Sequence, residues 1–139
     1  MKALSLWQPW ASLIAIGAKR YETRSWSTRY RGPILICAAK TMNSECKRAL
    51  LDVEIQKALV GAGVKIIPFG VAVCIVDLKG CYPTGNMSKE QIGTDLPFGD
   101  FTPGRYAWKL EDLRKIPPFA VKGKQGLFDV PLMPGETYF

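Results

Sequence analysis

The sequence contains no histidine. Histidine is the usual proton carrier near neutral pH and a common metal ligand, so its absence excludes a Ser-His-Asp triad, a Cys-His pair and a histidine-bound metal within this chain. Any proton transfer must use Lys, Glu, Asp, Tyr or Cys. The four cysteines, Cys37, Cys46, Cys74 and Cys81, lack the C-x-x-C spacing of a zinc site. We expect them to be reduced and buried, with no metal bound.

The sequence also lacks long apolar runs. None approaches the roughly 20 residues that a membrane-spanning helix needs, and the first residues, MKALS, do not lead into the apolar region of a signal peptide. We therefore expect a cytoplasmic protein without a membrane partner. Its 139 residues, 47% of them hydrophobic, predict one globular domain over residues 1–139. The formal net charge of +7 favours a polyanionic partner such as nucleic acid.

The hydrophobic periodicity predicts a mixture of short strands and helices. Strands are expected over residues 2–6, 19–26, 33–39, 70–78 and 105–113, with fragments near 121 and 127. Helices are expected over residues 9–16 and 43–59, with a short one near 88–91. These elements predict an α+β fold, a small closed β-barrel of five to six strands with two main helices packed beside it.

Residues 17–24, with the sequence GAKRYETR, place charges of both signs between apolar stretches. If a strand begins at Lys19, this side chain lies on the face opposite to Glu22 and Arg24. If the chain is still turning near Gly17, Lys19 can reach the same face as the other two. The group is then either an edge strand with an ion pair or a fixed site for an anionic ligand. In such a site Arg supplies a planar fork, Lys a point charge, and Glu orients one of them.

The same residues resemble a known family. Gly17-x-Lys19-x-x-Glu22-x-Arg24 matches the G-x-K-x-x-E-x-R signature of the ASCH domain, a relative of the PUA fold. Five further blocks, in order along the chain, look like the stand-alone bacterial and phage-borne members: LWQPWAS at 6–12, YRGP at 30–33, FGD at 98–100, PGRYAW at 103–108 and GKQGLF at 123–128.

The resemblance implies a PUA-like β-barrel with a basic cleft, lined by the signature Lys19, Glu22 and Arg24, between the barrel and the first helices. It also implies RNA binding. Some bacterial members are reported to be ribonucleases or amidohydrolases acting on N4-acetylcytidine nucleosides. The small amidohydrolases carry a threonine nucleophile where this chain has Glu22, and a carboxylate is a poor substitute. The neighbouring Thr23 is expected on the opposite face of the strand.

Several other side chains are candidates for ligand contact. Trp7 could stack on a base or plug the barrel mouth, and Gln8 could read a base edge or cap a strand end. The loop residues Arg29, Tyr30 and Arg31 could contact phosphate or form a solvated basic loop.

The same alternatives apply to Lys122 and Lys124. Arg105 is a further candidate for ligand contact. Asp100 could partner Lys19, or form with Arg105 an ion pair that holds the long loop.

Three functions remain open from the sequence. The first is a protein that binds RNA or a modified nucleoside, with no cofactor. The second is a hydrolase acting on an N-acylated nucleoside or on single-stranded RNA phosphodiesters. There Lys19 would be the base or electrostatic stabiliser, Glu22 or Asp100 the acid partner, and a carboxylate-bound Mg²⁺ would assist a ribonuclease. The third is a non-catalytic protein-interaction module. The sequence does not define an oligomeric state.

Overall fold

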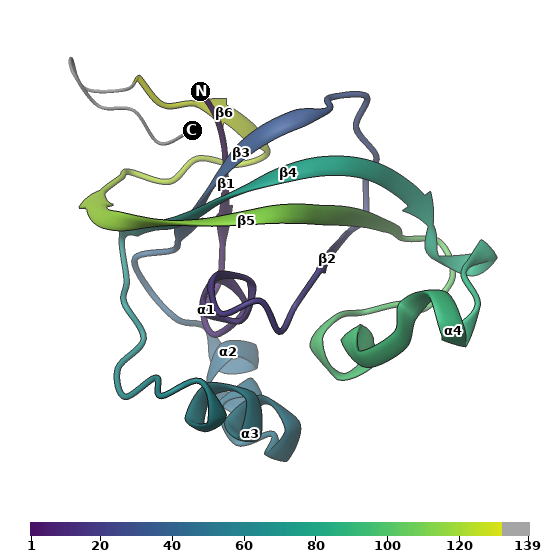
Figure 1. Ribbon diagram of the computed structural model, residues 1–139, viewed down its shortest axis with the longest axis horizontal. Coiled ribbons are helices and arrows are strands. Elements are labelled where there is room, and N and C mark those ends of the chain that lie inside the picture. Colours follow the sequence, from purple (N-terminus) through teal and green to yellow (C-terminus); the bar gives the residue numbers. More distant parts are fainter. Residues whose placement is uncertain (132–139) are drawn as a thin grey trace.

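The computed structural model describes residues 1–131, in which six strands form one mixed sheet (Figure 1). The strand order is β2-β5-β4-β3-β1-β6, and every neighbouring pair is antiparallel except β1 and β3. The strands are β1 (Lys2–Leu6), β2 (Tyr21–Arg24), β3 (Gly32–Ala38), β4 (Val71–Pro83), β5 (Tyr106–Ala120) and β6 (Leu127–Asp129).

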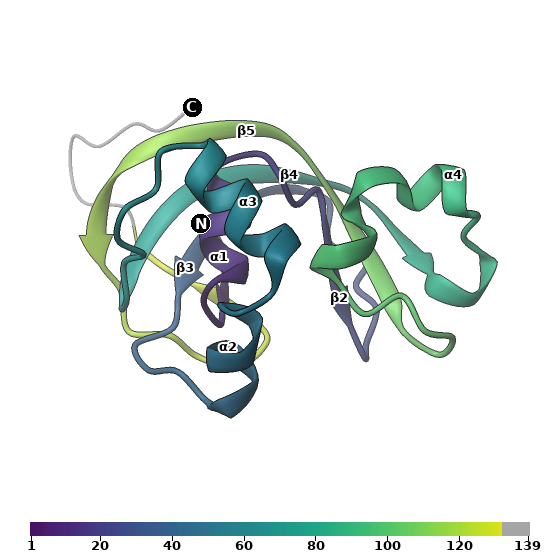
Figure 2. The same ribbon diagram turned by 90° about the horizontal axis from the view of Figure 1, so that it is seen from below.

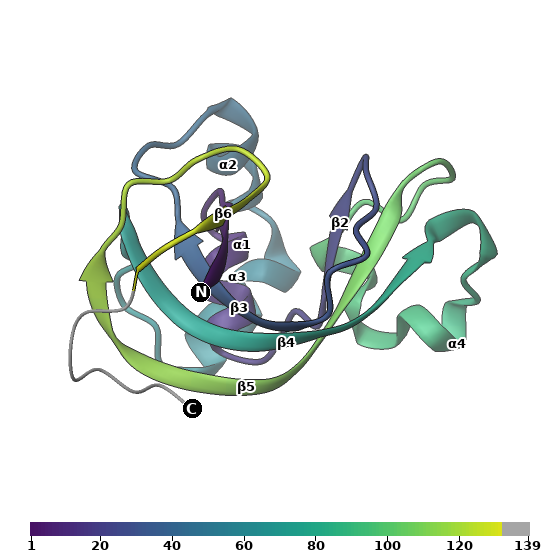
Figure 3. The same ribbon diagram turned by 90° about the horizontal axis from the view of Figure 1, so that it is seen from above.

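The sheet is strongly curved but is not closed. β2 and β6 are its outer strands, and within residues 1–131 no strand pairing joins them. Figure 3 shows β2 rising on one limb of the curve, opposite β1 and β6 on the other. The α+β class and the barrel-like arrangement are thus confirmed, whereas the expected closure of the barrel is corrected to an open sheet.

Three helices cover one face of the sheet: α1 (Trp10–Ala15), α2 (Ser44–Ala49) and α3 (Val53–Gly61), as Figure 2 shows. A short helix, α4 (Lys89–Ile92), lies with 3₁₀ turns at Thr84–Asn86 and Gly93–Phe98 beyond the end of β4. None of the helices within residues 1–131 is long and apolar enough to cross a membrane.

The single helix expected over residues 43–59 is two helices. Asp52 has an extended backbone and its Oδ1 atom accepts hydrogen bonds from the backbone N–H groups of Glu54 and Ile55, so a new helix starts there. This start decides which face is buried: Val53 is 60% exposed, and Ile55, two residues later, faces the core.

The core has two layers, one on each side of β3. Ile34 and Ile36 pack with Trp108 under α1, while Leu35 and Cys37 pack against the other face. The continuous apolar run of this strand is therefore explained by burial on both faces.

The two longest strands exceed their expected lengths because they pair with each other almost throughout. β4 and β5 are paired from Val71↔Ala120 to Pro83↔Tyr106, with register shifts that bend the ribbon. Pro117 and Pro118 lie near one of these shifts, and Gly80 near another.

Candidate functional site

A cleft of about 750 Å³ lies between β2, the ends of β1 and α1, the α2–α3 region and the segment after α4. The three charged residues of the signature all line it. Its complete lining is Ser5, Leu6, Trp7, Trp10, Lys19, Glu22, Thr23, Arg24, Ser25, Trp26, Glu45, Arg48, Ala49, Asp52, Ile55, Pro97, Phe98, Gly99, Asp100 and Arg105.

Lys19 reaches this cleft because the chain turns between α1 and β2. Gly17 has a φ of +83°, a value that favours glycine, and the backbone N–H groups of Ala18 and Lys19 both donate to the carbonyl of Leu13. β2 begins only at Tyr21. The second of the two expected arrangements is therefore the one found, with Lys19 on the side of Glu22.

The Lys19 side chain is 1% exposed, and its amine has two partners. Its Nζ atom donates a 2.5 Å hydrogen bond to the Phe98 carbonyl and lies 3.7 Å from Oε1 of Glu22. Burial lowers the pKa of Lys19, while the nearby carboxylates of Glu22 and Asp95 oppose this shift. An amine of this kind gives up its proton more readily than a surface lysine, and it can act either as a charge or as a base.

Glu22 joins the two cations of the signature. Its Oε2 atom lies 3.2 Å from Nε of Arg24, and Glu22 and Arg24 share a face of β2 because they are two residues apart. The other end of the Arg24 guanidinium donates from Nη2 to the Ser5 carbonyl of β1, at 3.1 Å. A chain of charges, Lys19–Glu22–Arg24, thus runs along the cleft wall.

Two tryptophans flank this chain. Trp7, directly after β1, is 44% exposed and lines the cleft. Trp26 also lines it and packs edge-on against the buried Trp108, with ring centroids 4.7 Å apart and an interplanar angle of 89°. The Trp108 indole N–H donates to the Trp26 carbonyl. Trp7 therefore exposes part of its ring at the cleft, while Trp26 is held by its contact with Trp108.

Asp100 and Arg105 lie at the cleft as an ion pair, with Oδ2 of Asp100 and Nε of Arg105 3.5 Å apart. Arg105 also donates to the Thr23 carbonyl, and hydrogen bonds from Thr102 lower the pKa of Asp100. The carboxylate in contact with Lys19 is Glu22. Of the two roles considered for Asp100, the observed contacts are those of the loop-holding pair.

The prediction that Gln8 could read the edge of a base is corrected by the structure. Its side chain is completely buried, its amide nitrogen donates to Ser12 and to the Pro68 carbonyl, and its oxygen accepts from the Ser12 N–H. All of its polar atoms are engaged at the start of α1. It caps a helix end and is not available to a base.

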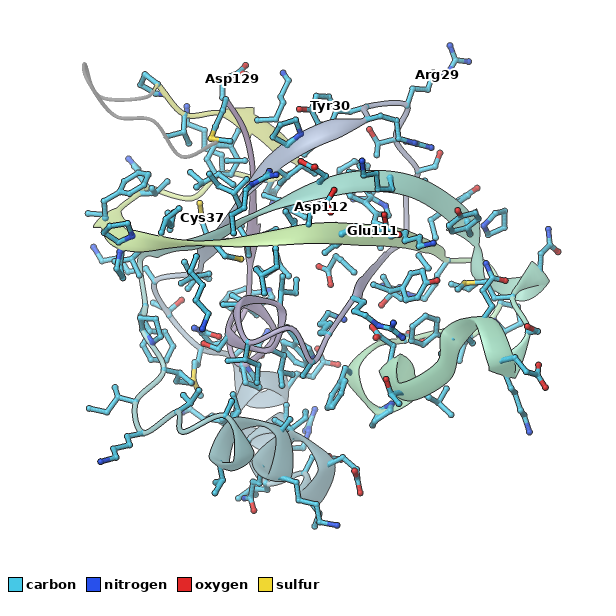
Figure 4. All side chains as sticks on the ribbon, in the orientation of Figure 1. Arg29, Tyr30, Cys37, Glu111, Asp112 and Asp129 are labelled. Carbon is cyan, nitrogen blue, oxygen red and sulfur yellow. The ribbon has the colours of Figure 1, made fainter. Side chains whose placement is uncertain are left out.

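The basic loop is likewise outside the cleft. Arg29 points away from the molecule (Figure 4), and Tyr30 packs against the core cluster under α1 without lining the cleft. The Tyr30 hydroxyl donates to the Pro33 carbonyl, and Arg31 donates to carbonyls of its own loop. Charges that cluster in the sequence here do not contribute to the site lined by Lys19.

One positioning residue has no sequence signal. Asp95 is completely buried, and its carboxylate accepts hydrogen bonds from the backbone N–H groups of Arg20 and Tyr21 at 2.8–3.1 Å. It thereby fixes the start of β2 between Lys19 and Glu22. An isolated aspartate in a polar loop gives no indication of a partner 75 residues away. Trp26 was missed too, although a third tryptophan two residues after Arg24 is a readable hint.

Within residues 1–131, no three His, Cys, Asp or Glu side chains converge on a position that could hold a metal ion. The cleft lining instead carries four basic side chains, those of Lys19, Arg24, Arg48 and Arg105, and four acidic ones, those of Glu22, Glu45, Asp52 and Asp100. The expected basic cleft is therefore corrected to a charge-balanced one, which suits a ligand with both hydrogen-bond donors and acceptors.

Comparison with known proteins gives concordant results. A family model described as "ASCH domain" matches residues 4–119. Activating signal cointegrator 1 of Homo sapiens and that of Mus musculus are each 35% identical over 97 residues. This match covers 68% of the chain but only 16% of those larger proteins.

Solved structures agree at the level of the fold. The crystal structure of ASCH from Zymomonas mobilis superposes with a TM-score of 0.60 at 15% identity, covering 94% of this chain and 87% of that one. A point mutant of the same Zymomonas mobilis protein gives a TM-score of 0.54 at 16% identity, covering 94% and 89%.

Proposed function

The chain belongs to the ASCH domain family, and on this premise we propose that it binds RNA or a modified nucleoside, with one base held in the cleft beside Lys19. The observation that carries the proposal is the convergence of Lys19, Glu22 and Arg24 on a single open cleft. A purely structural ion pair would have no need of such an opening.

The charge balance of the cleft supports a base as the bound group. A nucleobase presents donors and acceptors on one planar edge, and the Glu22 carboxylate and the two cations offer the matching acceptor and donors. The volume of about 750 Å³ lies within the roughly 300–1,000 Å³ of small-ligand sites. The half-exposed Trp7 ring provides a stacking surface at the mouth, as in proteins that bind single-stranded nucleic acid.

The test is a calorimetric titration with cytidine, N4-acetylcytidine and a short single-stranded RNA. We expect Lys19→Met and Glu22→Gln to weaken binding about tenfold or more, as for a lost charge-assisted hydrogen bond. The matched control Arg29→Gln removes a charge outside the cleft and should leave binding unchanged. Circular dichroism checks that each variant is folded. Equal binding by all three variants would overturn the cleft as the site and favour a protein-interaction module.

A second candidate function is hydrolysis of an N-acylated nucleoside. It is favoured by the lowered pKa of the Lys19 amine and its contact with Glu22. A neutral Lys19 amine would take a proton from water as its oxygen attacks the acyl carbonyl. The same proton would pass to the departing nitrogen as the C–N bond breaks, giving a carboxylic acid and the free nucleoside.

Water is the nucleophile in this scheme. Thr23, expected on the opposite face of the strand, is among the residues that line the cleft, and its hydroxyl accepts a hydrogen bond from the Asp100 N–H at 3.0 Å. Chromatography of N4-acetylcytidine and RNA incubated with the protein, with and without Mg²⁺, tests for products. Product that forms with the wild type and is lost in Lys19→Met would establish that the protein is a hydrolase. If the wild type binds the ligand but forms no product, the protein is a binding protein without this activity.

A further inference from the structure

A second hollow, of about 1340 Å³, opens directly beside the cleft. The two share five lining residues at the ends of β1 and β2: Ser5, Leu6, Trp7, Arg24 and Trp26. The remaining lining comes from Ala39, Lys40, Phe69, Gly70, Val71 and residues 120–126. Trp7 and Arg24 therefore form a wall that the cleft and the second hollow share. The two hollows lie side by side and together make one continuous groove on the protein surface.

The two hollows differ in charge. The cleft has equal numbers of basic and acidic side chains, whereas the second hollow is lined by Arg24, Lys40, Lys122 and Lys124 and by no carboxylate among residues 1–131. Within that described part, the three lysines are exposed and none lies within 4.0 Å of an Asp or Glu oxygen. Three lysines that have no carboxylate partner among residues 1–131 and surround one hollow favour an anionic occupant.

The loop that carries Lys122 and Lys124 is fixed against the sheet. A Cβ atom at Gly123 would lie 2.7 Å from Oγ of Ser5, so the loop backbone lies directly on the end of β1. The backbone N–H of Val121 donates to the Gly70 carbonyl at 3.1 Å. The two lysines therefore extend from an anchored segment that starts at the shared wall.

The hollow also has aromatic surface. Trp7, Trp26 and Phe69 line it, and Phe69 is 39% exposed. Lysines that follow a groove, interleaved with exposed aromatic rings, are the combination that binds single-stranded nucleic acid: cations contact phosphates and rings stack with bases. A free nucleoside carries no phosphate and would leave these lysines without a partner.

We propose that the second hollow binds the phosphodiester backbone of the nucleotides next to the base in the cleft. The ligand is then a single strand of RNA several nucleotides long, which crosses the wall formed by Trp7 and Arg24. This inference rests on the proposed function, since it needs a base in the cleft to set the register of the strand.

The experiment compares cytidine with a single-stranded RNA hexanucleotide on wild type and on Lys122→Gln/Lys124→Gln. Lys47→Gln/Lys65→Gln is the matched control, because both of its lysines are exposed, lie outside both hollows and give the same change of charge. We expect the wild type to bind the hexanucleotide at least about tenfold tighter than cytidine. The Lys122/Lys124 variant should lose most of that difference and bind cytidine normally.

Salt dependence gives an independent readout. Log affinity falls with log salt concentration, and each phosphate contact on a single strand adds about 0.7 to the steepness of this fall. The Lys122/Lys124 variant, which loses two such contacts, should therefore show a slope that is shallower by about 1.4. An identical slope and affinity for this variant and the control would overturn the inference while leaving the base site intact. If Lys19→Met and Glu22→Gln both bind cytidine as tightly as the wild type does, the proposed function is overturned instead.

Discussion

The Nζ atom of Lys19 lies 3.7 Å from Oε1 of Glu22, although only Glu22 belongs to β2. The contact forms because the chain after α1 remains hydrogen-bonded to Leu13 and turns at Gly17 before the strand begins. The amine is held from a second side by the Phe98 carbonyl. A buried cation is thus matched by a carboxylate and a backbone acceptor, at the bottom of an open cleft.

The pH dependence of stability should report this burial. Because the folded-state pKa of Lys19 is lowered below its usual 10.5, the unfolded chain binds more protons between the two pKa values. The free energy of unfolding should therefore rise with pH between the folded-state and unfolded-state pKa values. Lys19→Met should lack this rise, as measured by urea unfolding at several pH values. Lys109→Met is the control, since the pKa of Lys109 is raised, mainly by the Glu111 hydrogen bond, and its effect has the opposite sign.

Asp95→Asn should destabilise the protein by about 2–4 kcal/mol, because the amide NH₂ replaces an oxygen that accepts from buried backbone N–H groups. Ligand affinity should fall as well, since the start of β2 positions the signature. Asp129→Asn is the control: that carboxylate is 77% exposed in its ion pair with Lys2, and its loss should cost less than about 1 kcal/mol. Chemical denaturation and calorimetry measure both effects, and equal stability of the two variants would contradict the positioning role.

Trp7→Ala should weaken the binding of a base by about 1–3 kcal/mol, the usual contribution of an aromatic stack. Trp7→Phe should retain most of the affinity because a ring remains. Stability should change little in either variant, since Trp7 is 44% exposed. Leu51→Ala, a truncation of a side chain that is 75% exposed and outside both hollows, serves as the control. Unchanged affinity in Trp7→Ala would show that the base stacks elsewhere.

The cysteines should differ in reactivity. Burial raises the pKa of Cys37 and of Cys74 to about 12, so few of these thiols are ionised at pH 8, whereas Cys81 is only half-buried. Iodoacetamide should modify Cys81 first, and Cys37 and Cys74 only on unfolding. Peptide mapping by mass spectrometry measures the order. Modification of Cys37 as fast as Cys81 would mean that the core around β3 opens in the native state.

Much of the fold could be predicted because the deciding interactions are local. β1 has the predicted bounds, and the strand expected over residues 33–39 is found as β3, whose apolar run is buried on both faces. The helix boundary at Asp52 was missed although an N-cap followed by Glu54 was readable. The length of β5 was missed for another reason: Pro117 and Pro118 normally end a strand, and only its pairing with β4 keeps this one going.

The same distinction applies to the site. Lys19, Glu22 and Arg24 lie within six residues of one another, so a short pattern could reveal them. Asp95 acts on a backbone far away in sequence and could not be found from the pattern. The Arg29–Arg31 loop illustrates the converse: basic residues adjacent in sequence lie outside the lining of the cleft.

The open sheet has a mechanical consequence. Within residues 1–131 no strand pairing ties β2 to β1, and the link between these two limbs is made by side chains, among them the Arg24 guanidinium on the Ser5 carbonyl. Separating β2 from β1 would therefore break side-chain contacts but no strand pairing. On the proposed function, we expect a bulky substituent on a bound base to be accommodated by parting the two ends of the sheet, at the expense of this side-chain contact and with every strand pairing left intact.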